Sequence, residues 1–268
     1  MKLDDWRVQG GEPVALARFA TDGSDLIKDK DDARARLVQL GERLEALQEL
    51  LYAEGKHRLL VVLQAMDAGG KDSTIRHVFQ GVDPLGVKVA SFGPPSLEEA
   101  ARDYLWRVHR HVPASGEIAI FNRSHYEDVL VPRVRGEIDA AEWRRRYRQI
   151  NDFERMLVET GTTIVKLYLH VSRDEQKKRL QARRDTPEKQ WKFRFGDLSV
   201  RAQWEDYMAA YEAALAATST AGAPWYVIPA DNKLARNLLV STLLIQKLEV
   251  LEMRYPDPLP GIEAAKID

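Results

Sequence analysis

Short apolar runs alternate with helix-forming segments along most of this 268-residue chain. The clearest run, residues 59–63, is continuous rather than alternating, which is typical of a strand buried on both faces of a parallel sheet. Four further strands are expected at 87–92, 117–121, 163–171 and 225–228. Because parallel neighbours need crossover connections that cover the sheet, the pattern predicts an α/β fold of three layers, with helices on both faces of one parallel sheet.

Helical patterns fill the intervals between these strands. They are expected at about 97–111, 124–135, 139–160, 199–217 and 232–254, after a first helix that runs from Asp29 towards Gly55. In that first helix, leucines recur every three or four residues and form one apolar stripe: Leu37, Leu40, Leu44, Leu47 and Leu51. We expect an N-terminal arm at 1–28, a single domain at 29–255 and a C-terminal tail at 256–268.

Composition excludes several classes of site and location. The chain has no cysteine, which rules out disulfide frameworks, thiolate zinc sites, iron–sulfur clusters and cysteine nucleophiles. Its apolar runs do not exceed five residues, whereas a membrane span needs about 18. The first residues are charged and carry no hydrophobic signal core, so we expect a cytoplasmic protein with no membrane partner.

A glycine-rich loop follows the first predicted strand and closes on Gly70 and Lys71. A strand, such a loop and a helix aim backbone N–H groups and the positive end of a helix dipole at one point, which suits a phosphate. Lys71 can reach the outer phosphate oxygens as a point charge. The loop departs from the standard P-loop pattern because Ala65 replaces its first glycine. The expected phosphate- or nucleotide-binding members are Ala68, Gly69, Gly70, Asp72, Ser73 and Thr74.

Two details of this loop bear on metal binding. Asp72 stands where the metal-binding hydroxyl of a P-loop belongs, and hydroxyls appear one place later. Asp67 lies inside the loop, where phosphate would repel a carboxylate unless a divalent cation lay between them. We therefore predict that Asp67 holds Mg²⁺. The alternative is a glycine-rich turn in which Asp67 only caps the next helix.

A second polar cluster follows the 117–121 strand. Asn122 and Arg123 lie at the strand end, where neighbouring strands of such folds present groups to a nucleotide. If a helix begins near Ser124, Asp128 shares its face and could reach the same metal as Asp67. Ser124 could equally be an N-cap, with Glu127 completing a capping box.

His125, in the same cluster, admits a phosphohistidine hypothesis. A hydrogen-bonded structural role is favoured for it, as for most histidines near a helix start.

Residues 173–194 form a basic stretch with nine Lys or Arg and four acids, a net charge of +5 within a chain whose net charge is −1. Pro187 and Gly196 bracket a segment in which cations alternate with aromatic residues. We interpret 173–197 as a mobile basic lid over phosphate groups, with a solvated helix face as the alternative. Its expected phosphate-facing cations are Arg183, Lys189, Lys192 and Arg194. A second run, Arg144–Arg146 with Arg148, is expected to be plain surface or an oligomer contact.

Together these stretches resemble the polyphosphate kinase 2 family, P-loop kinases that exchange phosphate between inorganic polyphosphate and nucleotides. The similarity runs from about residue 12 to 255 and is most specific at 64–74, 81–84, 103–107 and 121–134. The resemblance implies that Asp67 and Asp128 are magnesium-binding carboxylates, with manganese as a substitute. It also implies that Lys71 is the loop lysine and that Asn122, Arg123 and Arg133 contact phosphate. The family's loop usually continues Lys-Asp-Gly, where this chain has Ser73.

The implied function is a polyphosphate-dependent nucleotide kinase. It transfers the terminal phosphate of polyphosphate to AMP or ADP by a direct, in-line, magnesium-assisted step that can run in either direction, without a phosphoenzyme. The expected catalytic residues are Asp67, Lys71, Arg123 and Asp128. The resemblance also implies a homodimer or homotetramer.

Two alternatives stay open at this point. One is an ATP-dependent nucleotide or small-molecule kinase, and the other is a nucleotide-binding module without catalysis. A nucleic-acid partner is not expected, because no recognisable reading motif accompanies the basic stretch.

Overall fold

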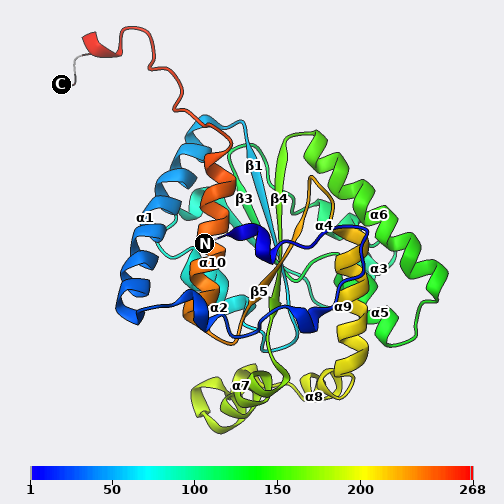
Figure 1. Ribbon diagram of the computed structural model, residues 1–268. Helices are drawn as coiled ribbons and strands as arrows, with labels where there is room; N and C mark the ends of the chain where they lie inside the picture. The colour runs from blue at the N-terminus through cyan, green and yellow to red at the C-terminus, as the bar shows by residue number, and fades with distance from the viewer. Residues whose placement is uncertain (1, 266, 268) are drawn as a thin grey trace.

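The computed structural model describes residues 2–265 and 267, which form a five-stranded parallel sheet between two layers of helices (Figure 1). The order across the sheet is β2-β3-β1-β4-β5. The strands are β1 (Arg58–Gln64), β2 (Val87–Ser91), β3 (Ile118–Asn122), β4 (Thr162–His170) and β5 (Trp225–Pro229). Every strand boundary lies within one residue of its predicted position, and the predicted α/β class with a parallel sheet is confirmed.

Helices α1, α2 and α10 cover one face of the sheet, and α5, α6 and α9 cover the other, while α7 and α8 lie beyond the carboxyl ends of the strands (Figure 1). Their bounds are α1 (Lys30–Glu54), α2 (Lys71–Val78), α3 (Leu97–Ala100), α4 (Trp106–His109), α5 (Glu127–Val134), α6 (Ala140–Glu159), α7 (Arg173–Asp185), α8 (Phe195–Ala202), α9 (Trp204–Thr218) and α10 (Lys233–Glu249). Single 3₁₀ turns are η1 (Leu3–Trp6), η2 (Leu16–Arg18), η3 (Ser24–Leu26), η4 (Pro84–Gly86), η5 (Pro187–Lys192) and η6 (Ile262–Ala264).

Strand β1 and helix α1 form where the sequence patterns place them. Leu59 to Val62 are fully buried, as expected for a strand covered on both faces. Helix α1 begins after Asp29, whose carboxylate accepts hydrogen bonds from two backbone N–H groups, and ends at Gly55 with φ of 64°. Three leucines of the predicted stripe are buried in the core: Leu44, Leu47 and Leu51.

The single helix predicted at 97–111 is wrong. Two short helices, α3 and α4, occupy this interval, and Asp103 lies between them. The Asp103 carboxylate accepts hydrogen bonds from the backbone N–H groups of Leu105 and Trp106, at 3.1 and 3.0 Å. An aspartate that bonds its own downstream backbone in this way favours a turn over a continuous helix. The helix predicted at 199–217 is likewise divided, into α8 and α9, with a break at Gln203.

The helix start predicted at Ser124 is also wrong. Helix α5 begins at Glu127, and Ser124 lies in the turn before it. The Ser124 hydroxyl accepts a hydrogen bond from the backbone N–H of Tyr126, so the predicted capping box with Glu127 does not form. Ser124 and Asp128 therefore do not share a helical face, and Asp128 reaches its surroundings from the first turn of α5.

The two ends of the chain differ in how they meet the core. Val8 and Leu16 are buried, and the Val8 N–H donates a hydrogen bond to the Trp225 carbonyl at 2.9 Å, beside β5. The C-terminal segment extends away from the body, and Leu259 is exposed (Figure 1). The boundaries predicted for arm, domain and tail stay predictions. Residues 1, 266 and 268, which fall in the predicted arm and tail, lie outside the described residues. Across residues 2–265 and 267, no helix has both the length and the apolar character needed to cross a bilayer.

Candidate active site

The glycine-rich loop joins the carboxyl end of β1 to the first turn of α2. Gly70 has φ of 108°, which lets the chain turn directly into the helix at Lys71. Lys71 is buried, and its ammonium donates a hydrogen bond to the Ala65 carbonyl at 3.0 Å. Burial, followed by the nearby charge of Arg123, lowers the pKa of Lys71. The lysine thus lies along the inside of the loop.

The loop hydroxyls are already hydrogen-bonded within the start of α2. Ser73 and Thr74 each donate to the Gly70 carbonyl at 3.0 Å. The Asp72 carboxylate accepts a hydrogen bond from the Asn122 side chain at 2.8 Å, which links the loop to the end of β3. These contacts fix the shape of the loop across two neighbouring strands.

Two residues of the site have backbone strain. Ala68 has φ of 58° and Arg123 has φ of 64°, a region that side chains with a β-carbon rarely adopt. Such conformations persist only where surrounding contacts hold them, and they concentrate at functional sites. Here one lies in the glycine-rich loop and the other at the end of the adjacent strand.

A cavity of about 280 Å³ lies beside the loop, bounded by the segment after β2 and by α5, α8 and α9. It brings together three of the predicted catalytic residues, Asp67, Arg123 and Asp128. Its less polar wall is formed by Pro94, Pro95, Val131, Pro132, Tyr207 and Tyr211. The cavity therefore combines charged groups, which suit a phosphate, with prolines and tyrosines, which suit a flat apolar group such as a nucleobase.

The two predicted metal ligands each have an arginine partner. Asp67 accepts a hydrogen bond from Arg123 at 2.6 Å, and Asp128 accepts one from Arg107 at 2.7 Å. Arg107 also donates to the Gly93 carbonyl at 2.8 Å, which ties Asp128 to the segment after β2. Burial raises the pKa of Asp128, although the Arg107 hydrogen bond and charge act in the opposite direction.

The donor chemistry of the cavity fits a hard divalent cation that also binds phosphate. In each of Asp67 and Asp128, the second carboxylate oxygen has no hydrogen bond to a described residue. Among residues 2–265 and 267, no three carboxylate or imidazole groups are placed to hold a metal by themselves. Mg²⁺ in phosphoryl-transfer sites is usually held by one or two carboxylates together with substrate phosphates and water, so two aspartates are sufficient.

Sequence reasoning missed two charged residues here. Glu127 lines the cavity next to Asp128, and burial raises its pKa against the charges of Arg123 and Lys71. Arg107 is almost completely buried and reaches Asp128 from α4. Glu127 could have been found from the sequence, because it is adjacent to Asp128 at the start of α5. Arg107 ends one of the stretches that carry the family resemblance, 103–107, but no local pattern gave it a role, because its partner is 21 residues away.

Other predicted residues lie outside the cavity. Arg133 donates a hydrogen bond to the Tyr147 hydroxyl at 3.0 Å and stacks over Trp143, whereas Arg135 lines the cavity. In the second arginine run, Arg146 is not plain surface as expected, because it donates a hydrogen bond to the Asp128 carbonyl. The other three cations of that run are exposed on α6: Arg144, Arg145 and Arg148.

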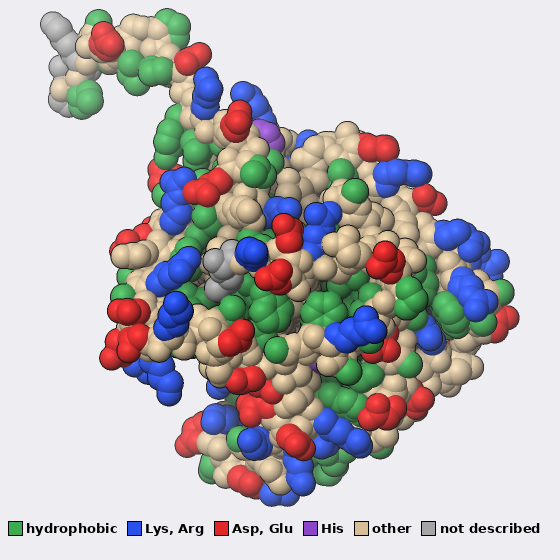
Figure 2. Space-filling view, viewed as in Figure 1, with side chains coloured by type: hydrophobic (Ala, Val, Ile, Leu, Met, Phe, Trp, Pro, Cys, Tyr) green, Lys and Arg blue, Asp and Glu red, His purple; other side chains and the backbone are tan. Residues whose placement is uncertain are grey.

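The predicted lid comprises α7, η5 and the start of α8. Arg183 pairs with Asp197 at 3.2 Å, and Lys192 stacks on Trp191. Lys189 and Arg194 are exposed. Acidic and basic side chains are interleaved on this part of the surface, at the bottom of Figure 2. The segment stands next to the carboxyl edge of the sheet, and its role as a lid stays a prediction.

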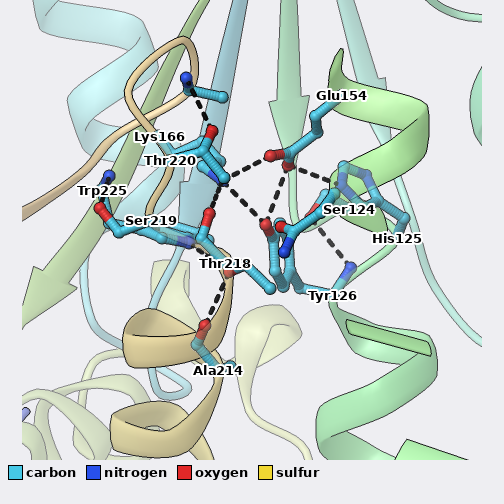
Figure 3. A network of polar contacts seen from close by, with 12 residues as sticks. Ser124, His125, Tyr126, Glu154, Lys166, Ala214, Thr218, Ser219, Thr220 and Trp225 are labelled. Atoms are coloured by element: carbon cyan, nitrogen blue, oxygen red, sulfur yellow. Dashed lines mark hydrogen bonds and ion pairs between the residues drawn. The ribbon is translucent and has the colours of Figure 1, made fainter. Parts of the chain in front are cut away.

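His125 lies in a buried polar network below the site (Figure 3). Its Nε2 is 3.2 Å from Glu154, which also accepts hydrogen bonds from Tyr126 and Lys166. Lys166 donates in addition to the Tyr126 hydroxyl and to the Thr218 carbonyl. This burial agrees with the structural role favoured for His125, because a buried imidazole cannot meet a phosphate group.

Replacing His125 with Asn should retain turnover. The loss of the hydrogen bond to Glu154 should lower the free energy of unfolding by about 1–3 kcal/mol, the usual cost of an unsatisfied buried group. Initial rates and denaturant unfolding measure the two effects. An acid-labile phosphoenzyme in the wild type that disappears in this variant would contradict the expectation.

A glycine-rich phosphate loop, with carboxylates and arginines around the adjoining cavity, defines a phosphoryl-transfer enzyme of the P-loop class. The family model for Polyphosphate kinase 2 (PPK2) matches residues 27–256. The chain belongs to the polyphosphate kinase 2 family and is a phosphotransferase. Enzymes that transfer phosphoryl groups generally use a divalent metal.

Similar proteins cover nearly the whole chain. An AMP/ADP-polyphosphate phosphotransferase of Meiothermus ruber is 57% identical over 267 residues, which span 99% of this chain and 100% of that protein. An ADP-polyphosphate phosphotransferase of Rhodopseudomonas palustris is 44% identical, over 97% of this chain and 94% of that protein. The crystal structure of polyphosphate kinase 2 from Arthrobacter aurescens TC1 has a TM-score of 0.93 at 46% identity, covering 97% of this chain and 93% of that chain.

Proposed function

We propose that this chain transfers the terminal phosphate of inorganic polyphosphate to AMP and to ADP. One observation carries the proposal: the glycine-rich loop borders a cavity with both apolar and charged groups, and the basic helix α7 contacts the same loop through Gln176 and Arg179. The cavity suits a nucleotide, with its base against the proline and tyrosine wall and its phosphate near Arg123. The basic side suits a polyanion. The names of the similar Meiothermus and Rhodopseudomonas proteins support both substrates.

The reaction needs no general base. An oxygen of the acceptor's phosphate is already ionised at neutral pH, so it can attack the terminal phosphorus of the donor directly. The bond from that phosphorus to the next bridging oxygen breaks, and the shortened polyphosphate leaves with the electron pair. Lys71 and Arg123 bind the transferring group and neutralise its charge, while the cavity holds the acceptor in line. No protein group becomes phosphorylated.

Asp67 and Asp128 are the residues that would hold the divalent cation, which we propose to be Mg²⁺, with Mn²⁺ as a substitute. When bound, the cation supplies positive charge to phosphate oxygens of donor and acceptor. Until then, the arginine partners hold the two carboxylates at the wall of the cavity, each through one carboxylate oxygen.

A donor and acceptor matrix tests the proposal. Polyphosphate and ATP are each supplied with AMP, ADP, GMP and GDP in the presence of Mg²⁺, and products are separated by ion-exchange chromatography. We expect ADP from AMP, and ATP from ADP, with polyphosphate as the donor. Product from ATP alone would favour an ATP-dependent kinase, and binding with no product from either donor would favour a non-catalytic nucleotide-binding module. Saturable, salt-sensitive DNA binding at micromolar concentration would favour a nucleic-acid partner.

The lid hypothesis has its own test. Replacing Lys189, Lys192 and Arg194 together with Ala should raise the KM for polyphosphate about tenfold at low salt, because three attracting charges are lost, and less at high salt. The KM for AMP should change little. The matched control replaces three exposed arginines of α6 with Ala: Arg144, Arg145 and Arg148. An equal rise in KM for the control would show that overall charge, and not the predicted lid, governs polyphosphate binding.

A further inference from the structure

A buried arginine lies directly behind the glycine-rich loop, on the side away from the cavity. Arg236 belongs to the first turns of α10 and has no solvent exposure. A β-carbon added at Gly70 would collide with its Nη1 atom and would lie 3.5 Å from Nη1 of Arg179. The guanidinium of Arg236 therefore packs against the backbone of the loop, where α10 lies beside α2 (Figure 1).

The charge of Arg236 is not neutralised. In the described part of the chain, no carboxylate lies within 4.0 Å of its nitrogen atoms, and Nη1 has no hydrogen-bond partner at all. Its Nε and Nη2 both donate to the side-chain oxygen of Asn237, at 3.1 and 2.9 Å. Asn237 is neutral, so it satisfies two donors and leaves the positive charge intact. An aspartate at that position would satisfy the same donors and cancel the charge.

A second arginine lies on this side of the loop, but its charge is paired. Arg179 donates to the carbonyls of Ala68 and Ala230, at 3.2 and 2.6 Å, and pairs with Glu175 at 2.9 Å. Burial, and then the charge of Arg179, lowers the pKa of Arg236 to about 10. Arg236 thus stays protonated at neutral pH despite a buried and repulsive setting.

A buried charge without an opposite charge destabilises the fold. Packing alone would favour an apolar side chain of similar volume at this place, since such replacements of buried charges are often stabilising. The unpaired charge of Arg236 is explained if an anion binds on the outer side of the loop and interacts with it. The glycine-rich loop offers a place for such an anion.

We propose that Arg236 is a positioning residue for the donor: its unneutralised charge, behind the backbone of Gly70, attracts and orders the phosphates of a linear polyphosphate at the loop. This inference rests on the proposed function, because it assigns the donor to the loop face opposite the nucleotide cavity. It predicts an effect on donor binding that is separate from acceptor binding, and it predicts that removing the charge does not weaken the fold.

The test uses two variants that remove the charge in different ways. Asn237→Asp neutralises Arg236 at the atom that already accepts its two hydrogen bonds, without changing side-chain size. Arg236→Met removes the charge and keeps most of the volume. Both should raise the KM for polyphosphate about ten- to a hundredfold. Both should raise the dissociation constant for tripolyphosphate, measured calorimetrically without acceptor, by the same factor. This is the usual effect of losing a bond to a charged group. The KM for AMP should stay within about twofold.

Thermal unfolding separates binding from folding. Both variants should melt at or above the wild-type temperature. Arg155→Met, which removes an exposed cation of α6, is the matched control and should leave both donor constants unchanged. The proposal is overturned if both variants bind tripolyphosphate as the wild type does, or if donor binding weakens only together with a lower melting temperature. Wild-type protein that binds tripolyphosphate but transfers no phosphate would instead contradict the proposed function.

Discussion

Replacing Asp67 with Ala should lower the rate of phosphate transfer by more than about a hundredfold, with little change in folding stability. Asp67 is the carboxylate inside the glycine-rich loop, and the contribution proposed for it is to hold positive charge where charge develops in the transition state. Removing one preorganised electrostatic group commonly costs a factor of about 10²–10³ in rate. Initial rates with polyphosphate and AMP at saturating Mg²⁺ measure the effect.

The fold should tolerate this change because the partner of Asp67 is not deeply buried. The Arg123 side chain is 37% exposed, so its charge stays hydrated when the carboxylate is removed. Asp128→Ala is a less clean test, since its partner Arg107 is only 4% exposed and would keep only a 3.9 Å contact with Glu99. Asp152→Ala, at an exposed position of α6, is the control and should leave the rate unchanged. Turnover by Asp67→Ala within about tenfold of wild type would exclude the assigned role.

The second large effect is an effect on stability, expected in the buried network of Figure 3. Replacing Lys166 with Met should lower the free energy of unfolding by about 3–5 kcal/mol, because Glu154 would become a buried carboxylate without its cation. Lys166 and Glu154 are 2.5 Å apart and at most 1% exposed. The double replacement Lys166→Met with Glu154→Gln should recover part of the loss, since no uncompensated charge is left. Urea unfolding of the two variants and the wild type measures both effects.

The contribution of this pair should depend on pH. Burial alone would raise the pKa of Glu154, but the Lys166 charge and the His125 contact outweigh it and hold that pKa below its ordinary value. A carboxylate whose pKa is lower in the folded chain stabilises it above the unfolded pKa of about 4.3, and this stabilisation is lost as pH falls through the folded pKa. The stability difference between wild type and the double variant should therefore narrow below about pH 4. A difference that does not change with pH would contradict an ionised Glu154.

The strands were predictable from the sequence because a strand that is buried on both faces needs consecutive apolar residues. Strands β1, β3 and β5 are short apolar runs, whereas the edge strand β2 is partly exposed and contains Lys88. A continuous run such as 59–63 fits a parallel sheet better than an amphipathic one. The glycine-rich loop was predictable for a similar reason, since its glycines, Lys71 and Asp67 are contiguous. The errors occurred where a local hydrogen bond interrupts a helical pattern, as Asp103 does between α3 and α4.

The candidate site was predictable only in part. Asp67, Arg123 and Asp128 follow two strands whose carboxyl ends meet at one edge of the sheet, so topology alone brings them together. Arg107 comes from a helix on another segment, and its role depends on the 2.7 Å contact with Asp128. Arg133, which lies on the same helix as Asp128, is instead directed to Tyr147 by the packing of α6. The direction in which such a side chain points is set by tertiary packing, and the spacing of residues along the sequence does not reveal it.

The sequence by itself therefore determined the class of fold, the phosphate loop and the family resemblance, since each depends on residues that are neighbours along the chain. Only the tertiary structure decided which charges are paired. It placed Arg107 on Asp128, Lys166 on Glu154, and Arg236 behind Gly70 with a neutral amide as its partner. The physical reason is that the energy of a charge depends on burial and on neighbours from distant segments, which come together only when the crossover helices pack on the sheet.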